Sequence, residues 1–162
     1  MTAKLRRVGS YYREQRFVDM LARVSPTTIS VSGNLAEMNA TINKKFTFKN
    51  DIDVWSIKDY WAAPHEFAAK GEGDCDDFAI YKYFALKQIG FPFGKTYLGT
   101  CTYTQTGELH LVTLVGPQFM VMDNLIDEVL PAACRPDLLF NSAVNNEGLF
   151  LFRPGKQCVV PQ

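Results

Sequence analysis

The segment from Asp74 to Ile89 limits the possible folds of this 162-residue chain more than any other. From Phe78 onward nearly every side chain in it is apolar or aromatic, and the polar exceptions are Lys82, Lys87 and Gln88. A Gly-Glu-Gly stretch precedes it, Asp74 is a good N-cap, and Gly90 and Pro92 follow its end. A helix that is apolar on most sides is buried on most sides, so we expect the rest of the chain to pack around it.

Shorter helical patterns precede this segment. Residues 11–24 carry apolar side chains at helical spacing and stop before Pro26, and the pattern recurs from Leu35 to Ile42, ending before Phe46. Pro64 suits the first turn of a short helix that runs to Lys70, because its missing N–H would be unpaired there. The aromatic stretch from Asp51 to Trp61 is predicted to be irregular.

After the central helix the hydrophobic period changes from helical to alternating. Residues 95–103, 108–115 and 118–124 are rich in β-forming side chains and are separated by Thr-Gly and Gly-Pro breakers, which predicts an antiparallel meander. Further strand material lies at 138–140 and 148–152. Helices followed by a meander indicate an α+β fold, in a single domain over residues 1–162, with N-terminal helices at about 11–45 and a core at about 46–155.

Charge and composition exclude several classes of partner. The 17 basic and 17 acidic residues cancel, so no bulk field favours nucleic acid or an anionic membrane. One basic cluster (Lys4, Arg6, Arg7, Arg13 and Arg16) is interpreted as the solvent-exposed face of the first helix. No apolar run reaches the roughly 20 residues of a membrane span. We therefore expect neither nucleic-acid binding nor direct membrane insertion.

Among the cysteines, Cys75 has the position that suggests a catalytic nucleophile. It follows the N-cap Asp74, where free backbone N–H groups and the positive end of the helix dipole favour a thiolate. The alternative is a small buried residue at a helix start. The other cysteines, Cys101, Cys134 and Cys158, lie in strand-like or loop-like sequence, and the four together are too scattered for a disulfide scaffold.

The hairpin around Gly116-Pro117 predicts a partner for His110. A loop centred on these two residues pairs Val115 with Gln118 and, further along, His110 with Asp123. Directly opposed side chains have Cβ atoms about 4.5–5.5 Å apart, close enough for the carboxylate to accept a proton from the imidazole. The alternative is a polar pair without a catalytic role.

Together, the three residues meet the needs of nucleophilic catalysis by a thiol. Cys75 supplies the nucleophile, His110 the base, and Asp123 the group that fixes the tautomer of the base. His65, the other histidine, lies on the short helix after Pro64 with no strand to hold a carboxylate opposite it, and is interpreted as a surface or structural residue.

Acidic residues crowd the proposed nucleophile. Asp74, Asp76 and Asp77 surround Cys75, and their charges should raise the pKa of its thiol and oppose activation. A bound hard cation such as Ca²⁺ would offset them. The spacing equally allows Asp74 to cap the helix, Asp77 to complete its first turn and Asp76 to face solvent.

Several separate motifs occur together in one order. They are Asp59 to Phe67 (DYWAAPHEF), Gly71 to Ile80 (GEGDCDDFAI), Lys82-Tyr83, Gly90-Phe91-Pro92, His110-Leu111-Val112 and Met122 to Leu125 (MDNL). In these runs, over roughly residues 34 to 152, the chain resembles the bacterial transglutaminase-like cysteine proteinases, which include LapG-type periplasmic proteases that release large biofilm adhesins. The usual family motif has glutamate after the cysteine, whereas this chain has Asp76.

The resemblance implies a fold, a site and a cellular role. It implies a papain-like core in which Cys75 begins the central helix, and His110 and Asp123 come from the following sheet. It also implies a calcium site beside the nucleophile, with Asp74, Asp76 and Asp77 as ligands. The implied substrate is the N-terminal region of a large repeat adhesin, and an implied partner is a membrane receptor that senses cyclic di-GMP. A periplasmic location is implied as well, together with a secretion leader that this N-terminus does not show.

Two other functions fit the same residues. A thioester on Cys75 captured by an amine would make the protein a transglutaminase-like acyltransferase. A calcium-dependent interaction module with a vestigial Cys-His-Asp set is the second alternative.

Overall fold

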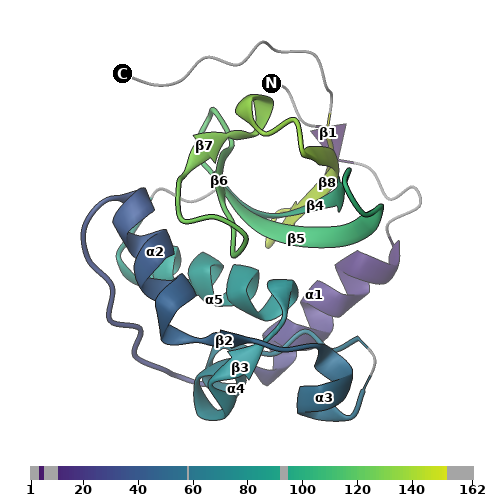
Figure 1. Ribbon diagram of the computed structural model, residues 1–162. Helices are drawn as coiled ribbons and strands as arrows, with labels where there is room; N and C mark the ends of the chain where they lie inside the picture. Colours follow the sequence, from purple (N-terminus) through teal and green to yellow (C-terminus); the bar gives the residue numbers. More distant parts are fainter. Residues whose placement is uncertain (1–3, 6–10, 58, 92–94, 153–162) are drawn as a thin grey trace.

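The computed structural model describes residues 4–5, 11–57, 59–91 and 95–152, with most helices before most strands (Figure 1). The helices are α1 (Tyr11–Arg23), α2 (Leu35–Lys45), α3 (Asp51–Trp55), α4 (Pro64–Lys70), α5 (Cys75–Gln88) and the 3₁₀ turn η1 (Ala132–Cys134). The strands are β1 (Lys4–Leu5), β2 (Thr47–Phe48), β3 (Glu72–Gly73), β4 (Thr96–Tyr103), β5 (Glu108–Val115), β6 (Met120–Met122), β7 (Leu130–Pro131), β8 (Leu138–Asn145) and β9 (Gly148–Leu151). Among the described helices, none is long and apolar enough to cross a membrane.

The central helix predicted from the sequence is α5. Two reciprocal hydrogen bonds define its start: the Asp74 carboxylate accepts from the Asp76 N–H, and the Asp77 carboxylate accepts from the Asp74 N–H, each at 3.1 Å. Past its other end, Gly90 adopts a φ of +76°, which a residue without a Cβ tolerates best. The predicted limits of this helix are confirmed to within one residue.

Buried side chains surround α5 on two sides. On one side its aromatic residues pack against α2 and α4, through Met38, Ile42, Phe67, Phe78 and Tyr81. On the other side it packs against α1 and the large sheet, through Phe17, Met20, Ile80, Tyr83, Leu98 and Leu111. Each buried apolar side chain of this size contributes roughly 1.5–3 kcal/mol. The burial of α5 on most of its faces is what its composition predicts.

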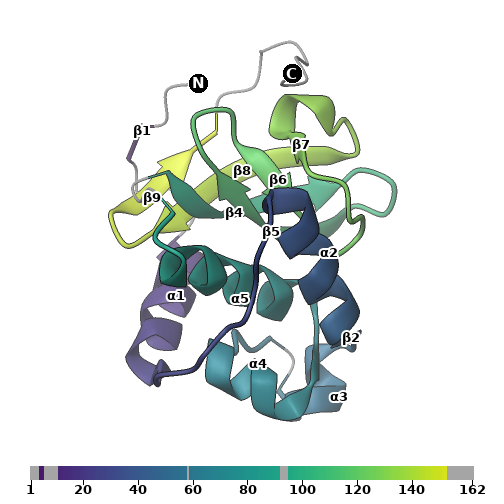
Figure 2. The same cartoon turned by 90° about the vertical axis from the view of Figure 1, so that its left-hand side faces the viewer.

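The large sheet has the strand order β1-β9-β8-β4-β5-β6-β7, with antiparallel pairing throughout. Figures 1 and 2 show the sheet curling over α5. The helices α1 and α2 lie on either side of α5, and α4 lies on the side of α5 away from the sheet. The Thr113 hydroxyl of β5 donates to the Ala79 carbonyl of α5 at 2.7 Å and so joins the sheet to the helix. The predicted α+β architecture and meander are confirmed.

The predicted register of the β5–β6 hairpin is wrong by two residues. Val115 pairs with Met120 rather than with Gln118, and β6 spans only Met120–Met122 instead of 118–124. The cause is a four-residue loop from Gly116 to Phe119, in which both end residues have positive φ and the Phe119 N–H donates to the Gly116 carbonyl at 3.2 Å. The loop is therefore centred one residue later than the sequence analysis assumed.

The segment from Thr47 to Trp55 is more ordered than predicted. Thr47 and Phe48 form β2, which pairs in parallel with β3, and α3 follows. Tertiary packing against the start of α5 imposes this structure on a sequence without helical or alternating periodicity.

The prediction that Arg16 faces solvent is also wrong. Its guanidinium donates to the Asp59 carbonyl and lies 3.4 Å from the Asp59 carboxylate. Arg23, on the same face of α1, donates to the Trp61 carbonyl and to Glu66. Long arginine stems let a polar helix face reach backbone carbonyls, so this face of α1 fastens the helix to the chain before α4. The side chains of Lys4, Arg6, Arg7 and Arg13 lie outside the described residues.

Candidate active site

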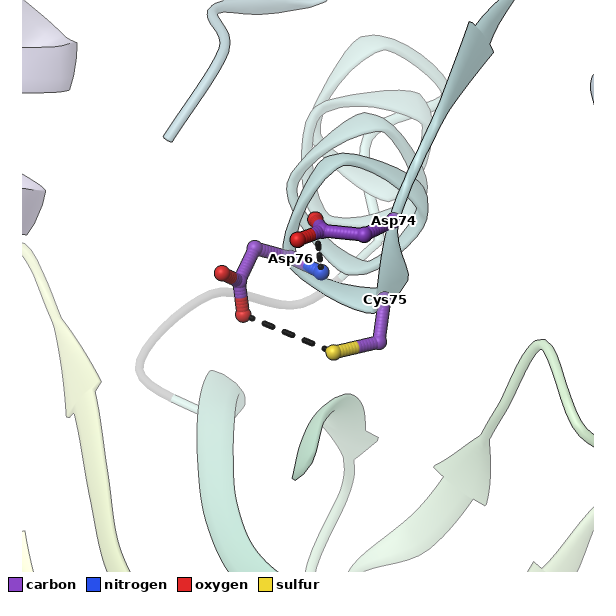
Figure 3. A group of neighbouring side chains, drawn as sticks. All are labelled: Asp74, Cys75 and Asp76. Atoms are coloured by element: carbon purple, nitrogen blue, oxygen red, sulfur yellow. Dashed lines mark hydrogen bonds between the residues drawn. The ribbon is translucent and has the colours of Figure 1, made fainter. Parts of the chain in front are cut away.

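Cys75 is the first residue of α5 and is partly exposed. Figure 3 shows the three consecutive residues at this helix start, with Asp74 folded back over the helix end and the Asp76 carboxylate turned toward the sulfur. The Cys75 thiol donates to Asp76 Oδ1 at 3.6 Å. The backbone of Leu111 in β5 also hydrogen-bonds the sulfur. The helix start predicted to carry the nucleophile therefore meets the strand that carries His110.

The surroundings of Cys75 oppose ionisation of its thiol. Burial raises the pKa of Cys75 well above its usual value, and the charges of Asp76 and Asp74 raise it further. The hydrogen bond from Leu111 lowers this pKa but does not compensate. These effects oppose a thiolate at Cys75, and a positive charge close to the carboxylates would offset them.

His110 and Asp123 are in contact, as the sequence analysis predicted. His110 Nε2 lies 2.7 Å from Asp123 Oδ1, and both side chains are buried. Because the register is shifted by two residues, they are diagonal rather than directly opposed neighbours. A shift of two keeps both side chains on one face of the sheet, and a diagonal pair is within reach of long side chains.

Asp123 accepts hydrogen bonds on both carboxylate oxygens. Oδ1 also accepts from the Leu125 N–H at 3.1 Å, and Oδ2 accepts from Arg135 Nη2 at 2.9 Å. Burial alone would raise the pKa of Asp123, but the hydrogen bonds from His110, Leu125 and Arg135 hold it below its usual value. Asp123 is thus an anion in position to accept a hydrogen bond from His110 Nε2.

His65 is held elsewhere. It lies on α4, and its Nδ1 accepts from the Ser25 N–H at 3.3 Å. This contact agrees with its interpretation as a structural residue, whereas the residue after His110, Leu111, contacts the Cys75 sulfur.

The three aspartates around Cys75 belong to a larger acidic cluster. Asp51 and Asp59 join them: ligand atoms of Asp51, Asp59 and Asp76 lie within 4.8 Å of one another, and so do those of Asp51, Asp74 and Asp77. Asp74 and Asp76 form a further such group with the Cys75 sulfur. The structure therefore brings together all three aspartates predicted as metal ligands and adds two from the segment before α4.

The carboxylates of the acidic cluster differ in how many hydrogen bonds the protein donates to them. Asp77 is completely buried and accepts from the Ala62 and Asp74 N–H groups, one on each oxygen. Asp51 is also buried, and its Oδ2 accepts from the Tyr60 N–H at 2.7 Å. Its Oδ1 is buried with no N–H or hydroxyl donor among the described residues, and the Asp51 carboxylate shares a hydrogen bond with the Asp74 carboxyl.

Because these carboxylates lie close together, each one costs free energy to ionise. Burial, together with neighbouring carboxylates, raises the pKa of Asp74 to about 10, that of Asp77 to about 8 and that of Asp76 to about 7. Burial also raises the pKa of Asp51. A set of oxygen ligands that holds protons this tightly suits a hard divalent cation, which would replace those protons.

Asp51, Asp59 and Arg135 were missed by the sequence analysis. Asp51 and Asp59 lie in the aromatic stretch from Asp51 to Trp61, before α4. Acidic residues in such a stretch could have indicated further metal ligands. Arg135 lies between η1 and β8, and no local pattern connects it to Asp123.

Comparison with known proteins agrees with this geometry. A profile of the bacterial transglutaminase-like cysteine proteinases (BTLCP) matches residues 13–136. A Legionella pneumophila LapG structure described as calcium-bound is 32% identical, with a TM-score of 0.67, over 78% of this chain and 72% of that one. An EGTA-treated LapG structure is 34% identical, with a TM-score of 0.65, over 72% of this chain and 64% of that one. Among curated protein sequences, no match was found.

The fold and these matches define a cysteine protease with a papain-like, transglutaminase-like core, in which the central helix begins at the cysteine. The family profile extends over most of the chain, and the Legionella structures are about one-third identical to it over the part that they cover. The chain belongs to the bacterial transglutaminase-like cysteine proteinase family.

Proposed function

We propose that this protein is a calcium-dependent cysteine endopeptidase that acts through Cys75, His110 and Asp123 and cleaves the N-terminal region of a large cell-surface adhesin. The observation that carries the proposal is the 2.7 Å contact between His110 and Asp123, with His110 on the strand that meets the helix start of Cys75. The Leu111 backbone, one residue from His110, reaches the Cys75 sulfur and supports a short path between base and nucleophile.

The contacts of His110 assign its two ring nitrogens. Nε2 faces the Asp123 carboxylate, so it carries the proton, and Nδ1 is the atom that accepts the proton of Cys75. Asp123 holds this tautomer and stabilises the imidazolium that forms.

In the reaction, the Cys75 thiolate attacks the peptide carbonyl carbon and forms a tetrahedral intermediate. The Cys75 backbone N–H, at the first position of α5, has no partner within the helix and can donate to the oxyanion. The intermediate collapses to a thioester as the amine leaves with the proton from His110. A water molecule, deprotonated by His110, then hydrolyses the thioester and restores the thiol.

Calcium is proposed to bind the acidic cluster, with ligands among Asp51, Asp59, Asp74, Asp76 and Asp77. The all-carboxylate donor set, which leaves Asp51 Oδ1 buried without an N–H donor, fits a hard cation. Calcium bound there would offset the charges of Asp74 and Asp76 that raise the pKa of the Cys75 thiol. The Legionella structures described as calcium-bound and EGTA-treated support this assignment by homology.

The biological part of the proposal rests on the family. By analogy with the LapG-type proteases, the substrate is a large repeat adhesin, the location is the periplasm, and the activity serves biofilm control. A membrane receptor that senses cyclic di-GMP is the proposed regulatory partner.

The test is cleavage of an adhesin N-terminal fragment by wild type, Cys75→Ala and chelated protein. We expect Cys75→Ala to lose about a thousandfold or more in rate, because the nucleophile is removed. Chelation should abolish cleavage, and added Ca²⁺ should restore it. Asp53→Asn, an exposed change in α3, is the control and should still cleave.

The outcomes separate the parts of the proposal. Cleavage by Cys75→Ala at the wild-type rate would disprove the protease mechanism. Full activity after chelation would remove only the calcium claim. Incorporation of a primary amine at the acyl position, in place of hydrolysis, would favour an acyltransferase.

A further inference from the structure

Asp123 is held from the side opposite His110 by a buried arginine. Arg135 Nη2 donates to Asp123 Oδ2 at 2.9 Å, while His110 occupies Oδ1. Arg135 is only 4% exposed and Asp123 only 1%. The two carboxylate oxygens therefore have separate partners, and the carboxylate plane is fixed by both.

Arg135 is in turn fixed by Asp137. Its Nε donates to Asp137 Oδ1 at 3.0 Å and its Nη2 to Asp137 Oδ2 at 2.9 Å, which is a two-pronged contact. The positive charge of Arg135 is balanced by Asp137. Asp123, Arg135 and Asp137 together therefore carry the same net negative charge as Asp123 alone. Arg135 can therefore orient Asp123 without cancelling the charge that stabilises the His110 imidazolium.

The arrangement is not explained by stability alone. Burying an arginine is costly, and a buried ion pair often contributes little net stability compared with apolar packing. The Nη1 atom of Arg135 is buried without a hydrogen-bond partner among the described residues, which adds to this cost. A costly buried guanidinium whose Nη2 lies against Asp123 points to a role in the site.

The backbone of Asp123 has its own support. The side-chain amides of Asn39 and Asn43 in α2 donate to the Asp123 carbonyl at 3.2 and 3.0 Å. Removing Arg135 should therefore leave the chain at Asp123 in place and release only Oδ2 of the carboxylate, while Oδ1 keeps the hydrogen bond from the Leu125 N–H. The two kinds of support can be separated by mutation.

We propose that Arg135, braced by Asp137, is a positioning residue that fixes the Asp123 carboxylate so that Oδ1 stays directed at His110 Nε2. The catalytic consequence rests on the proposed protease function. The structural consequence, an oriented and hydrogen-bonded His110 ring, does not depend on any substrate.

The first measurement is the NMR signal of the His110 ring. The chain has two histidines, and a proton held between His110 Nε2 and Asp123 should give a downfield resonance that is lost in Asp123→Asn. We expect Arg135→Met to broaden or lose this resonance. Arg135→Lys keeps the charge but not the two-pronged contact, so it should retain the resonance in part. Arg23→Met removes a partly buried arginine that binds Glu66, and should leave the resonance unchanged.

The second measurement is steady-state cleavage. We expect Arg135→Met to lower kcat by about 10- to 100-fold with little change in KM, as for other residues that orient a catalytic group through one contact. Asp137→Asn should lose less, because Arg135 still reaches Asp123.

The proposal is overturned if Arg135→Met keeps both the wild-type resonance and the wild-type kcat. If Arg135→Met does not fold, Arg135→Lys decides, and an unchanged resonance in that variant overturns the proposal. If the wild type cleaves no adhesin fragment, the protease proposal fails, while the NMR comparison still tests the role of Arg135.

Discussion

Calcium binding to the acidic cluster is expected to release protons from the protein at neutral pH. Because their pKa values are raised to about 10, 8 and 7, Asp74, Asp77 and Asp76 keep much of their protonation at pH 7. These three carboxyls together hold roughly two protons at that pH. Carboxylates must be ionised to bind a metal, so binding should release about two protons for each Ca²⁺.

The release can be counted by calorimetry. The heat of Ca²⁺ binding at pH 7, measured in two buffers with different ionisation enthalpies, gives the number of protons released. The affinity should rise by up to about a hundredfold per pH unit near pH 7, because about two protons compete with the metal. Asp53→Asn, an exposed change in α3 outside the cluster, is the matched control and should leave the proton count unchanged. Equal heats in both buffers would refute this reasoning.

The same shifts fix the pH dependence of stability without metal. The folded-state pKa values are raised above those of the unfolded chain, so the associated stability is present below about pH 4 and is lost as the pH rises through 7 to 10. The Tm of chelated protein should therefore fall between pH 5 and pH 9. Saturating Ca²⁺ should remove most of this fall, since the metal replaces the protons.

Two further predictions concern the fold. A Cβ at Gly99 would lie 2.5 Å from Leu114 Cδ1 in the core, so Gly99→Ala should lower the free energy of unfolding by about 1–3 kcal/mol in urea denaturation, and wild-type stability would contradict the described packing. The Asn34 side chain accepts from the Glu37 N–H at 2.9 Å as the N-cap of α2, so Asn34→Ala should cost about 1 kcal/mol in thermal denaturation. Asn50→Ala is its control, because Asn50 precedes α3 without a capping hydrogen bond from its side chain, and an equal loss there would argue against the capping explanation.

Local sequence determined α5 and its surroundings well. Asp74 and Asp77 at capping-box spacing, the apolar run after them and the glycine beyond the end are short-range signals, and each has its expected role in the structure. The strands of the meander were predicted for the same reason, because the β-forming side chains of β4 and β5 and the breakers between the strands are local signals.

The parts that sequence could not give depend on distant contacts. Gly116-Pro117 marked a turn, but the loop is extended by Phe119 at positive φ, a conformation that nothing in its residue type predicts. Asp51 and Asp59 reach the acidic cluster only because the chain folds back on the start of α5. Arg135 reaches Asp123 across the end of the sheet.

The pairing of β5 with β6, rather than the length of the loop that joins them, decides whether His110 meets Asp123. Side chains alternate along both strands, so a slip of the pairing by two residues leaves Asp123 on the same face as His110. A slip by one residue turns Asp123 to the opposite face and separates the two side chains. Residues inserted between Val115 and Met120 are therefore expected to be tolerated, whether even or odd in number, as long as these two residues stay paired.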